Sequence, residues 1–320
     1  MTNTTQKLGW IGVGRMGGPM AERLLAASHS VAIWNRTKAK ADPFAKRGAR
    51  VVERLAELSD VDVVFTMVSE GRDLEEVYFG REGLVTNSKG KLPKIFVDCS
   101  SISVEDSSRI RDRLKQHDVQ FVASPVSGNG QVIKAGKLSA VVSGPENAAK
   151  AVMPLINVFA AKGVSYVGDG ELARVCKIAH NVMLGVVIEN LIEITLLANK
   201  MGVPRHAFLA FMNNGVMGSM FTAYKTPALV NLDWKTTFTS ELLRKDLDLG
   251  LELAREWDVA MPVTAATREI VQAHIGRATT RQDNKDILAR DFAQMAETLA
   301  EYSGMTLKSE GKDIPTGLES

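Results

Sequence analysis

The feature that most constrains the fold is a glycine pattern near the start of the chain. An apolar segment at 8–12 runs into Gly12-Val13-Gly14-Arg15-Met16-Gly17, and a helix is predicted at 16–27. In a strand–turn–helix of this kind, the first glycine allows a tight turn, the second lets a phosphate approach the backbone, and the third permits close helix packing. The amino end of the helix then holds the anion. Because a second apolar strand follows at 30–34, we interpret the pattern as a dinucleotide-binding turn rather than an ordinary glycine turn.

The residues after the second predicted strand indicate which dinucleotide is bound. An NAD site usually places Asp or Glu here, against the ribose 2′-hydroxyl. This chain has Asn35, Arg36 and Thr37, followed by Lys38. A guanidinium can pair with a 2′-phosphate in a bidentate, charge-assisted way. We therefore predict NADP(H) in preference to NAD(H), with Arg36 as the main selector; the alternative is a solvated basic loop.

Strands and helices alternate through the first half of the chain, which predicts βαβ units and a parallel sheet covered on both faces. We expect 138–143 to add an antiparallel strand at the far edge of this sheet. The predicted strands are 8–12, 30–34, 61–67, 94–98, 119–122, 138–143 and 164–167, and the predicted helices are 16–27, 38–47, 71–79, 103–116 and 146–161.

The second half has a helical period instead. One uninterrupted pattern runs over 171–201 and ends at Gly202-Val203-Pro204. The predicted helices that follow it are 204–213, 239–257, 262–275 and 285–302. The sequence therefore predicts an α/β protein with an N-terminal Rossmann doubly wound sheet (1–167), an all-α substrate and oligomerisation domain (168–302) entered by one long interdomain helix, and a loose tail (303–320). The length of that helix favours a homodimer or homotetramer over a monomer.

Composition excludes several classes of protein. The formal charge is +2, which indicates neither a nucleic-acid partner nor a membrane surface, and no run of about 18 apolar residues is present. The two cysteines, Cys99 and Cys176, form no disulfide framework, and we expect two buried thiols in a reducing compartment. The 5 histidines lack metal-ligand spacing, so no metal is expected. The first residues show no signal-peptide pattern, and the expected location is cytoplasmic.

Polar residues in the long predicted helix are candidates for the chemistry. Lys177 and Asn181 lie four residues apart on one face, and His180 lies on the flank. An ammonium group half-buried beside an apolar stripe needs a partner, and a substrate oxygen would serve. The alternative is a lysine at the helix edge whose ammonium reaches solvent.

Three further segments carry polar groups. Ser127, with the N–H groups of Gly128 and Asn129, could hold a carboxylate after strand 119–122; the alternative is a glycine-rich turn. Asp98-Cys99-Ser100-Ser101 follows strand 94–98, and Ser103 should cap the next helix. Lys245-Asp246-Leu247-Asp248, taken alone, is a solvated charge run.

Together these motifs, in this order, resemble the β-hydroxyacid dehydrogenase family over about residues 8–300. The resemblance implies that Lys177 is the catalytic acid/base and that Ser127, Gly128 and Asn181 bind the substrate. It also implies that Ser101 and Lys245 lie against the cofactor. The full predicted cofactor set is Gly12, Gly14, Arg15, Met16, Gly17, Asn35, Arg36, Thr37, Met67, Val68, Ser101 and Lys245.

Three departures from the family pattern concern the substrate. Ala123-Ser124 stands where the family often has Asp-Ala, Asn129 stands in place of a second glycine, and His180 makes the helix motif similar to that of 6-phosphogluconate dehydrogenase. Asn129 and His180 suggest a substrate with additional polar groups. We predict hydride transfer between NADP(H) and a small β-hydroxy acid or semialdehyde. The alternatives are an imine reductase of the same domain plan and a non-catalytic NADP(H)-binding protein.

Overall fold

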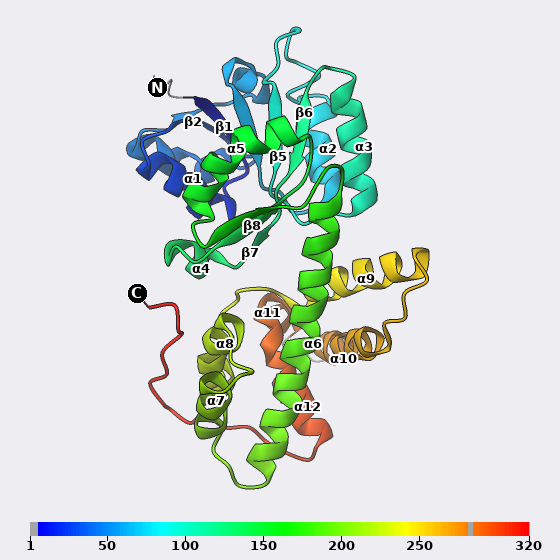
Figure 1. The fold of residues 1–320 in the computed structure, drawn as a ribbon. Helices are drawn as coiled ribbons and strands as arrows, with labels where there is room; N and C mark the ends of the chain where they lie inside the picture. Colours follow the sequence, from blue (N-terminus) through cyan, green and yellow to red (C-terminus); the bar gives the residue numbers. More distant parts are fainter. Residues whose placement is uncertain (1–5, 281–283, 320) are drawn as a thin grey trace. The chain divides into compact units, whose positions relative to one another are not determined.

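The computed structural model describes residues 6–280 and 284–319. It contains two compact units, Met1–Lys177 and Ile178–Ser320. The first is built around a β-sheet and the second is helical (Figure 1). An α/β Rossmann-like sheet followed by an all-α portion is the fold class that the sequence predicts, and this prediction is confirmed.

The main sheet of the first unit has six parallel strands in the order β3-β2-β1-β4-β5-β6. Chain order reverses between the neighbours β1 and β4, and open α/β sheets bind ligands at such a switch point, beyond the carboxyl ends of the strands. The strands are β1 (Lys7–Ile11), β2 (Ser30–Trp34), β3 (Arg50–Val51), β4 (Val63–Thr66), β5 (Ile95–Asp98) and β6 (Gln120–Ala123).

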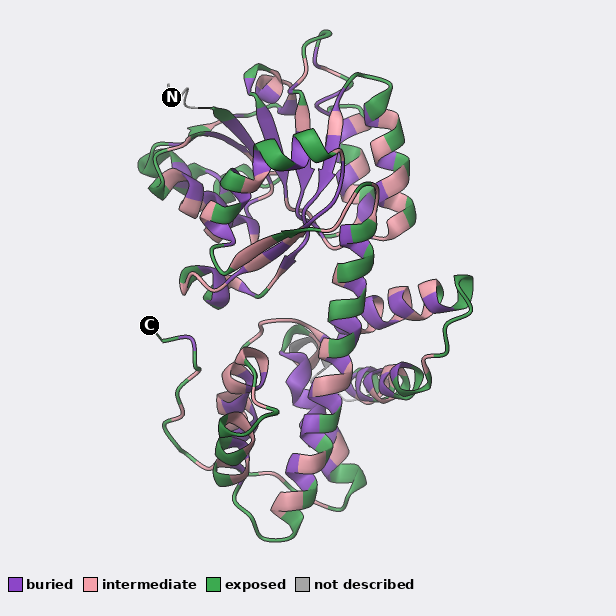
Figure 2. Cartoon of the chain, viewed as in Figure 1, coloured by how far each residue is buried: buried purple, intermediate pink, exposed green. Residues whose placement is uncertain are grey.

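Both faces of this sheet are covered, so most residues of its central strands are buried (Figure 2). Alternate residues face opposite sides. Val64 and Phe96 join a cluster with apolar residues of α2 (Gly71–Phe79) and α3 (Val104–Lys115). On the other face, Trp10 stacks on Phe65, and both meet Phe159 edge-on. Phe159 ends α5 (Glu146–Phe159), which packs beside α1 (Gly17–Ala26).

The expected antiparallel edge strand is instead part of a second, smaller sheet. β8 (Ser139–Val142) pairs antiparallel with β7 (Val126–Ser127) and parallel with β9 (Gly163–Tyr166). An isolated antiparallel bridge, Ala123↔Ser143, links it to β6. A short helix, α4 (Gly130–Lys134), lies between β7 and β8.

One predicted helix of the first unit has a different form. Residues 38–47 make two short 3₁₀ helices, Lys38–Lys40 and Asp42–Arg47, in place of one α-helix. Pro43 has no backbone N–H to continue an α-helical ladder from the preceding turn, which accounts for the break.

In the second unit, two elements differ from expectation. A helix at Met220–Asn231 (α8) was not predicted, and the predicted helix 285–302 is interrupted around Asp291. The helices that continue through this unit are α6 (Leu172–Lys200), α7 (Arg205–Asn214), α8, α9 (Ser240–Glu256), α10 (Pro262–Thr280), α11 (Asn284–Ala289), the 3₁₀ turn Phe292–Gln294 and α12 (Met295–Tyr302).

The C-terminal segment also differs from the loose tail that was expected. The Glu310 carboxylate accepts hydrogen bonds from the backbone N–H groups of Arg205 and His206 at the start of α7, at 2.8 and 3.0 Å. Arg205 in turn donates to the carbonyl of Lys308, and Leu318 is buried. Polar contacts, which apolar patterning does not reveal, therefore hold this segment to the second unit.

By length and composition alone, the helix α6 is long and apolar enough to cross a membrane, with a mean hydropathy of 1.7 over its most apolar 18-residue window. Half of that window is buried in the structure, as in a core helix of a globular protein. Ile188, Leu191 and Ile192 belong to the core of the second unit. Length and composition therefore give only weak support for a membrane span, and the absence of a membrane partner stays a prediction.

Candidate functional site

The glycine loop has the geometry that a pyrophosphate needs. Gly12 has a φ of +94°, and a Cβ atom there would collide with the carbonyl oxygen of Met67. A Cβ on Gly17 would collide with the carbonyl of Gly12. At Gly14, by contrast, a Cβ would meet no atom within 4 Å, so the backbone is open to a ligand. The first turn of α1 contains no acidic residue. This open cradle fits a dinucleotide phosphate.

The segment after β2 divides its predicted residues between two tasks. The side-chain oxygen of Asn35 accepts a hydrogen bond from the N–H of Val13 at 2.9 Å, and its Nδ2 donates to the carbonyl of Thr37. Asn35 thus fixes the glycine loop to the end of β2. The Arg36 side chain is 83% exposed, and its Nη1 lies 3.2 Å from Oδ1 of Asp73. Arg36 is therefore exposed and, unlike Asn35, is not held by the glycine loop.

A buried polar network connects the ends of β4 and β5 with the start of α6. Ser100 Oγ accepts from the N–H of Val68 at 2.9 Å and donates to Asp98 Oδ1 at 2.7 Å. The other Asp98 oxygen pairs with Arg174 at 2.5 Å, and both side chains are at most 1% exposed. Arg174 also donates to the carbonyl of Ser100 and to Ser107 Oγ.

Sequence reasoning missed the roles of Asp98 and Arg174. An arginine within an apolar helix face was the available signal, because such a group needs a buried acceptor. Arg174 lies three residues before Lys177 and anchors the first turns of α6. Ser143 Oγ, which accepts from the N–H of Ala173, and the ion pair between Arg111 and Glu171 hold the same end of the helix.

The predicted substrate loop lies close to the glycine loop. A Cβ on Gly130 would be 3.2 Å from the carbonyl oxygen of Arg15. Gly128 has a φ of +140°, and a Cβ there would be 2.6 Å from Val132 Cγ1, so the position requires glycine. Asn129 is 8% exposed, and its Oδ1 caps α4 by accepting from the N–H groups of Gln131 and Val132.

That capping role leaves part of the Asn129 amide for other contacts. Among the residues that the structure describes, its Nδ2 is buried and has no hydrogen-bond partner. Asn129 therefore caps α4, and its buried Nδ2 lies at the loop where substrate binding is predicted.

In the second unit, Asn181 is held from two sides. Its Nδ2 donates to Asp246 Oδ2 at 2.6 Å, and its Oδ1 lies 3.0 Å from His180 Nδ1. Asn181 and Asp246 are 6% and 3% exposed, whereas His180 is exposed. The interpretation of 245–248 as a solvated charge run is therefore wrong for Asp246. Lys245 lies 3.4 Å from the Asp246 carboxylate.

The two thiols differ from each other. Cys99 is buried, and burial raises the pKa of its thiol far above the ordinary range. Cys176 is exposed on α6, so the expectation of two buried thiols is wrong for this residue. Over residues 6–280 and 284–319 no group of three or more His, Cys, Asp or Glu side chains is arranged to hold a metal ion.

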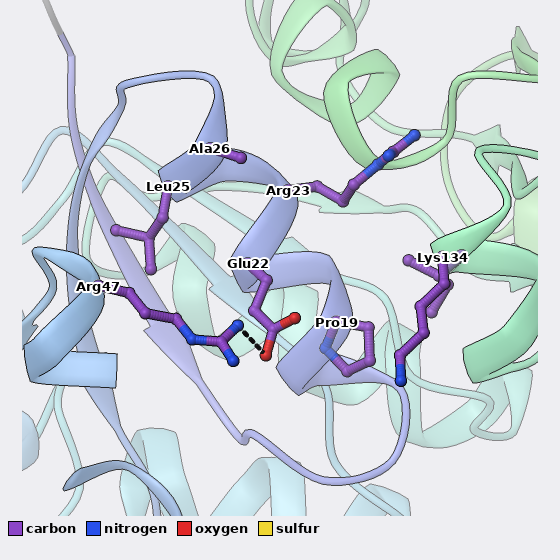
Figure 3. Close-up of a pocket in the computed structure, with 8 residues that line it drawn as sticks. Pro19, Glu22, Arg23, Leu25, Ala26, Arg47 and Lys134 are labelled. Atoms are coloured by element: carbon purple, nitrogen blue, oxygen red, sulfur yellow. Dashed lines mark ion pairs between the residues drawn. The ribbon is translucent and has the colours of Figure 1, made fainter. Parts of the chain in front are cut away.

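A cavity of about 460 Å³ lies away from these groups, among α1, α4 and the 3₁₀ segment Asp42–Arg47 (Figure 3). Its charged side chains include the Glu22–Arg47 ion pair, with Arg23 and Lys134 nearby. None of the predicted cofactor or substrate residues lines it. The candidate site is therefore the open edge of the sheet and its loops, not this cavity.

These features define the first unit as a Rossmann-type dinucleotide-binding unit. Residues 7–168 match the family model for the NAD-binding domain of 6-phosphogluconate dehydrogenase. Residues 171–290 match the model described as NAD-binding of NADP-dependent 3-hydroxyisobutyrate dehydrogenase. The chain belongs to the β-hydroxyacid dehydrogenase family.

Individual relatives are distant. Glyoxylate/succinic semialdehyde reductase 2 of Arabidopsis thaliana is 28% identical, over 83% of this chain and 74% of the relative. The 2-hydroxy-3-oxopropionate reductase of Escherichia coli strain K12 is 29% identical, over 88% of this chain and 96% of the relative. Human cytokine-like nuclear factor N-PAC is 27% identical, and the match spans only 51% of its length. The structure of Mycobacterium tuberculosis 3-hydroxyisobutyrate dehydrogenase has a TM-score of 0.78 at 23% identity, over 92% of this chain and 99% of that one.

Proposed function

We propose that this protein is an NADP(H)-dependent oxidoreductase that acts on a small β-hydroxy acid or the corresponding semialdehyde, with Lys177 as general acid and base. One observation carries the proposal: Lys177 lies on α6 between two immobilised neighbours. Arg174, three residues before it, is fixed by Asp98, and Asn181, four residues after it, is fixed by Asp246. The similarity to two relatives, a glyoxylate/succinic semialdehyde reductase and a 2-hydroxy-3-oxopropionate reductase, supports the substrate class.

Bound NADPH would supply the hydride to the carbonyl carbon of the substrate. In reduction, the Lys177 ammonium would donate a proton to the oxygen that becomes the hydroxyl group. In oxidation, the neutral amine would accept that proton. Ser127 and the N–H of Gly128 would hold the substrate carboxylate. The family resemblance implies that Asn181, whose amide donates to Asp246, also binds the substrate.

The preference for NADP(H) is proposed from Arg36 and from the residue that precedes it. Asn35 carries no charge to repel a 2′-phosphate, and its side chain is engaged by the glycine loop. The exposed Arg36 guanidinium is placed beyond the carboxyl end of β2, where the adenosine ribose binds in this fold. We also place Thr37, Met16, Met67, Val68, Ser101 and Lys245 around the cofactor; for Ser101 and Lys245 the basis is the family resemblance.

The deciding experiment follows the oxidation of NADPH, and of NADH in parallel, with a panel of small semialdehydes. Lys177→Ala should lower kcat by about 10²–10⁴-fold, the usual contribution of general acid–base catalysis, while the affinity for NADPH stays within about twofold. Lys200→Ala is the matched control, because it removes the same charge at the other end of α6. Turnover by Lys177→Ala equal to that of the control would refute the assignment.

The same panel separates the alternative functions. Reduction of a cyclic imine without turnover of any aldehyde would indicate an imine reductase. Tight binding of NADPH without turnover of any compound would indicate a non-catalytic binding protein. Equal use of NADH and NADPH would contradict the role of Arg36 and leave that of Lys177 standing.

A further inference from the structure

The ion pair between Arg36 and Asp73 spans the predicted adenosine end of the site. Arg36 follows β2, and Asp73 lies in the first turn of α2, which follows β4. β2 and β4 pair with opposite sides of β1, and Ile11 is in register with both Trp34 and Thr66. The contact therefore joins the two segments on either side of the strand that leads into the glycine loop.

We propose that Asp73 competes with the 2′-phosphate of NADP(H) for Arg36, and so limits how strongly the site prefers NADP(H) over NAD(H). This inference rests on the proposed function, because it assumes that Arg36 meets the phosphate. Asp73 would then be a specificity-determining residue that sequence motifs do not mark.

The exposure of the pair makes such competition feasible. Arg36 is 83% exposed and Asp73 24% exposed, and an ion pair of this kind contributes little to stability. A phosphate monoester carries about two negative charges and three acceptor oxygens, so it is the stronger partner for a guanidinium. A bound 2′-phosphate would displace Asp73 and then leave that carboxylate nearby as a like charge. NAD(H) has no 2′-phosphate and would not meet this cost.

The test is calorimetric titration of the full-length protein with adenosine 2′,5′-bisphosphate and with 5′-AMP, which differ by the 2′-phosphate, followed by NADP⁺ and NAD⁺. Asp73→Asn should tighten the binding of the bisphosphate by roughly three- to tenfold and change that of 5′-AMP by less than about twofold. Arg36→Ala should weaken the binding of the bisphosphate but not that of 5′-AMP. In the Arg36→Ala background, the increase in bisphosphate affinity caused by Asp73→Asn should be smaller, because the competition acts through Arg36.

Glu82→Gln is the matched control, since it removes the same charge beyond the other end of α2. The proposal is overturned if Asp73→Asn leaves the ratio of the two affinities unchanged, if Glu82→Gln changes it equally, or if the gain persists undiminished without Arg36. Wild-type protein that binds neither dinucleotide would refute the proposed function as well. Protein that binds NADP⁺ but turns over no aldehyde would refute only the proposed reaction and leave this test intact.

Discussion

Replacing Arg174 with methionine should destabilise the first unit strongly. The guanidinium is 1% exposed and donates to Asp98 Oδ2, to the carbonyl of Ser100 and to Ser107 Oγ. Methionine keeps much of the apolar volume but leaves the Asp98 carboxylate buried without its cation. Removing one partner of a buried ion pair typically costs about 3–5 kcal/mol, which is the expected decrease in the free energy of unfolding.

A second variant separates the buried charge from the general loss of contacts. In the double variant Asp98→Asn/Arg174→Met, no charge is left unpaired, and the amide oxygen that replaces the carboxylate can still accept from Ser100 Oγ. We expect the double variant to be more stable than Arg174→Met alone, because replacing a buried pair by neutral groups costs much less than breaking it. Arg54→Met is the control, since its pair with Glu57 is 77% exposed on the arginine side and should be worth less than about 1 kcal/mol.

The assay is urea unfolding followed by tryptophan fluorescence. Trp10 and Trp34 lie in the first unit, and Trp234 and Trp257 lie in the second, so a Trp234→Phe/Trp257→Phe background reports on the first unit alone. The reasoning is refuted if Arg174→Met is no less stable than Arg54→Met, or if the double variant is as unstable as the sum of its two single variants.

Two further predictions concern stability. Gly128→Ala should lower the melting temperature by an amount equivalent to roughly 1–3 kcal/mol, because the position has a φ of +140° and the added Cβ would press on Val132; an unchanged melting curve would contradict the strain. Burial lowers the pKa of His274 from 6.5 to about 4, so between those values the unfolded chain binds a proton that the folded chain does not. The free energy of unfolding should therefore fall as the pH drops through this window. His274→Gln should flatten that dependence in urea titrations at several pH values, and an equally steep profile in this variant would exclude His274 as its source.

The outline of the fold could be predicted because it depends on apolar periodicity and on glycine. The strands β1, β2, β4, β5 and β6, and the continuous helix α6, each follow from patterns within a few residues of one another, whereas the two-residue strand β3 is too short to give such a pattern. At Gly12 and Gly17 a backbone carbonyl lies too close for a side chain, so glycine is required there. The cofactor prediction depended on these same positions.

In the second unit, the elements that differ from the prediction have polar residues in their cores. α8 contains Pro227 and buries Lys225 together with Thr222 and Thr226, which disrupts an apolar stripe. The predicted helix 285–302 is interrupted where Asp291 pairs with Lys225 at 2.6 Å. Asp291 also accepts from the N–H and hydroxyl of Thr237, so the backbone adopts an extended conformation there in place of a helical one.

The same physical reason separates the site residues that sequence could identify from those that it could not. Lys177 and Asn181 could be predicted as site residues because they lie within one helix motif. Their supports lie far away in the chain: Asp98 is 76 residues from Arg174, and Asp246 is 65 residues from Asn181. A buried carboxylate is tolerated only where its partner meets it in three dimensions. A motif can therefore name the groups that touch a ligand, whereas the charges that hold those groups in place become visible only when the distant segments are seen to meet.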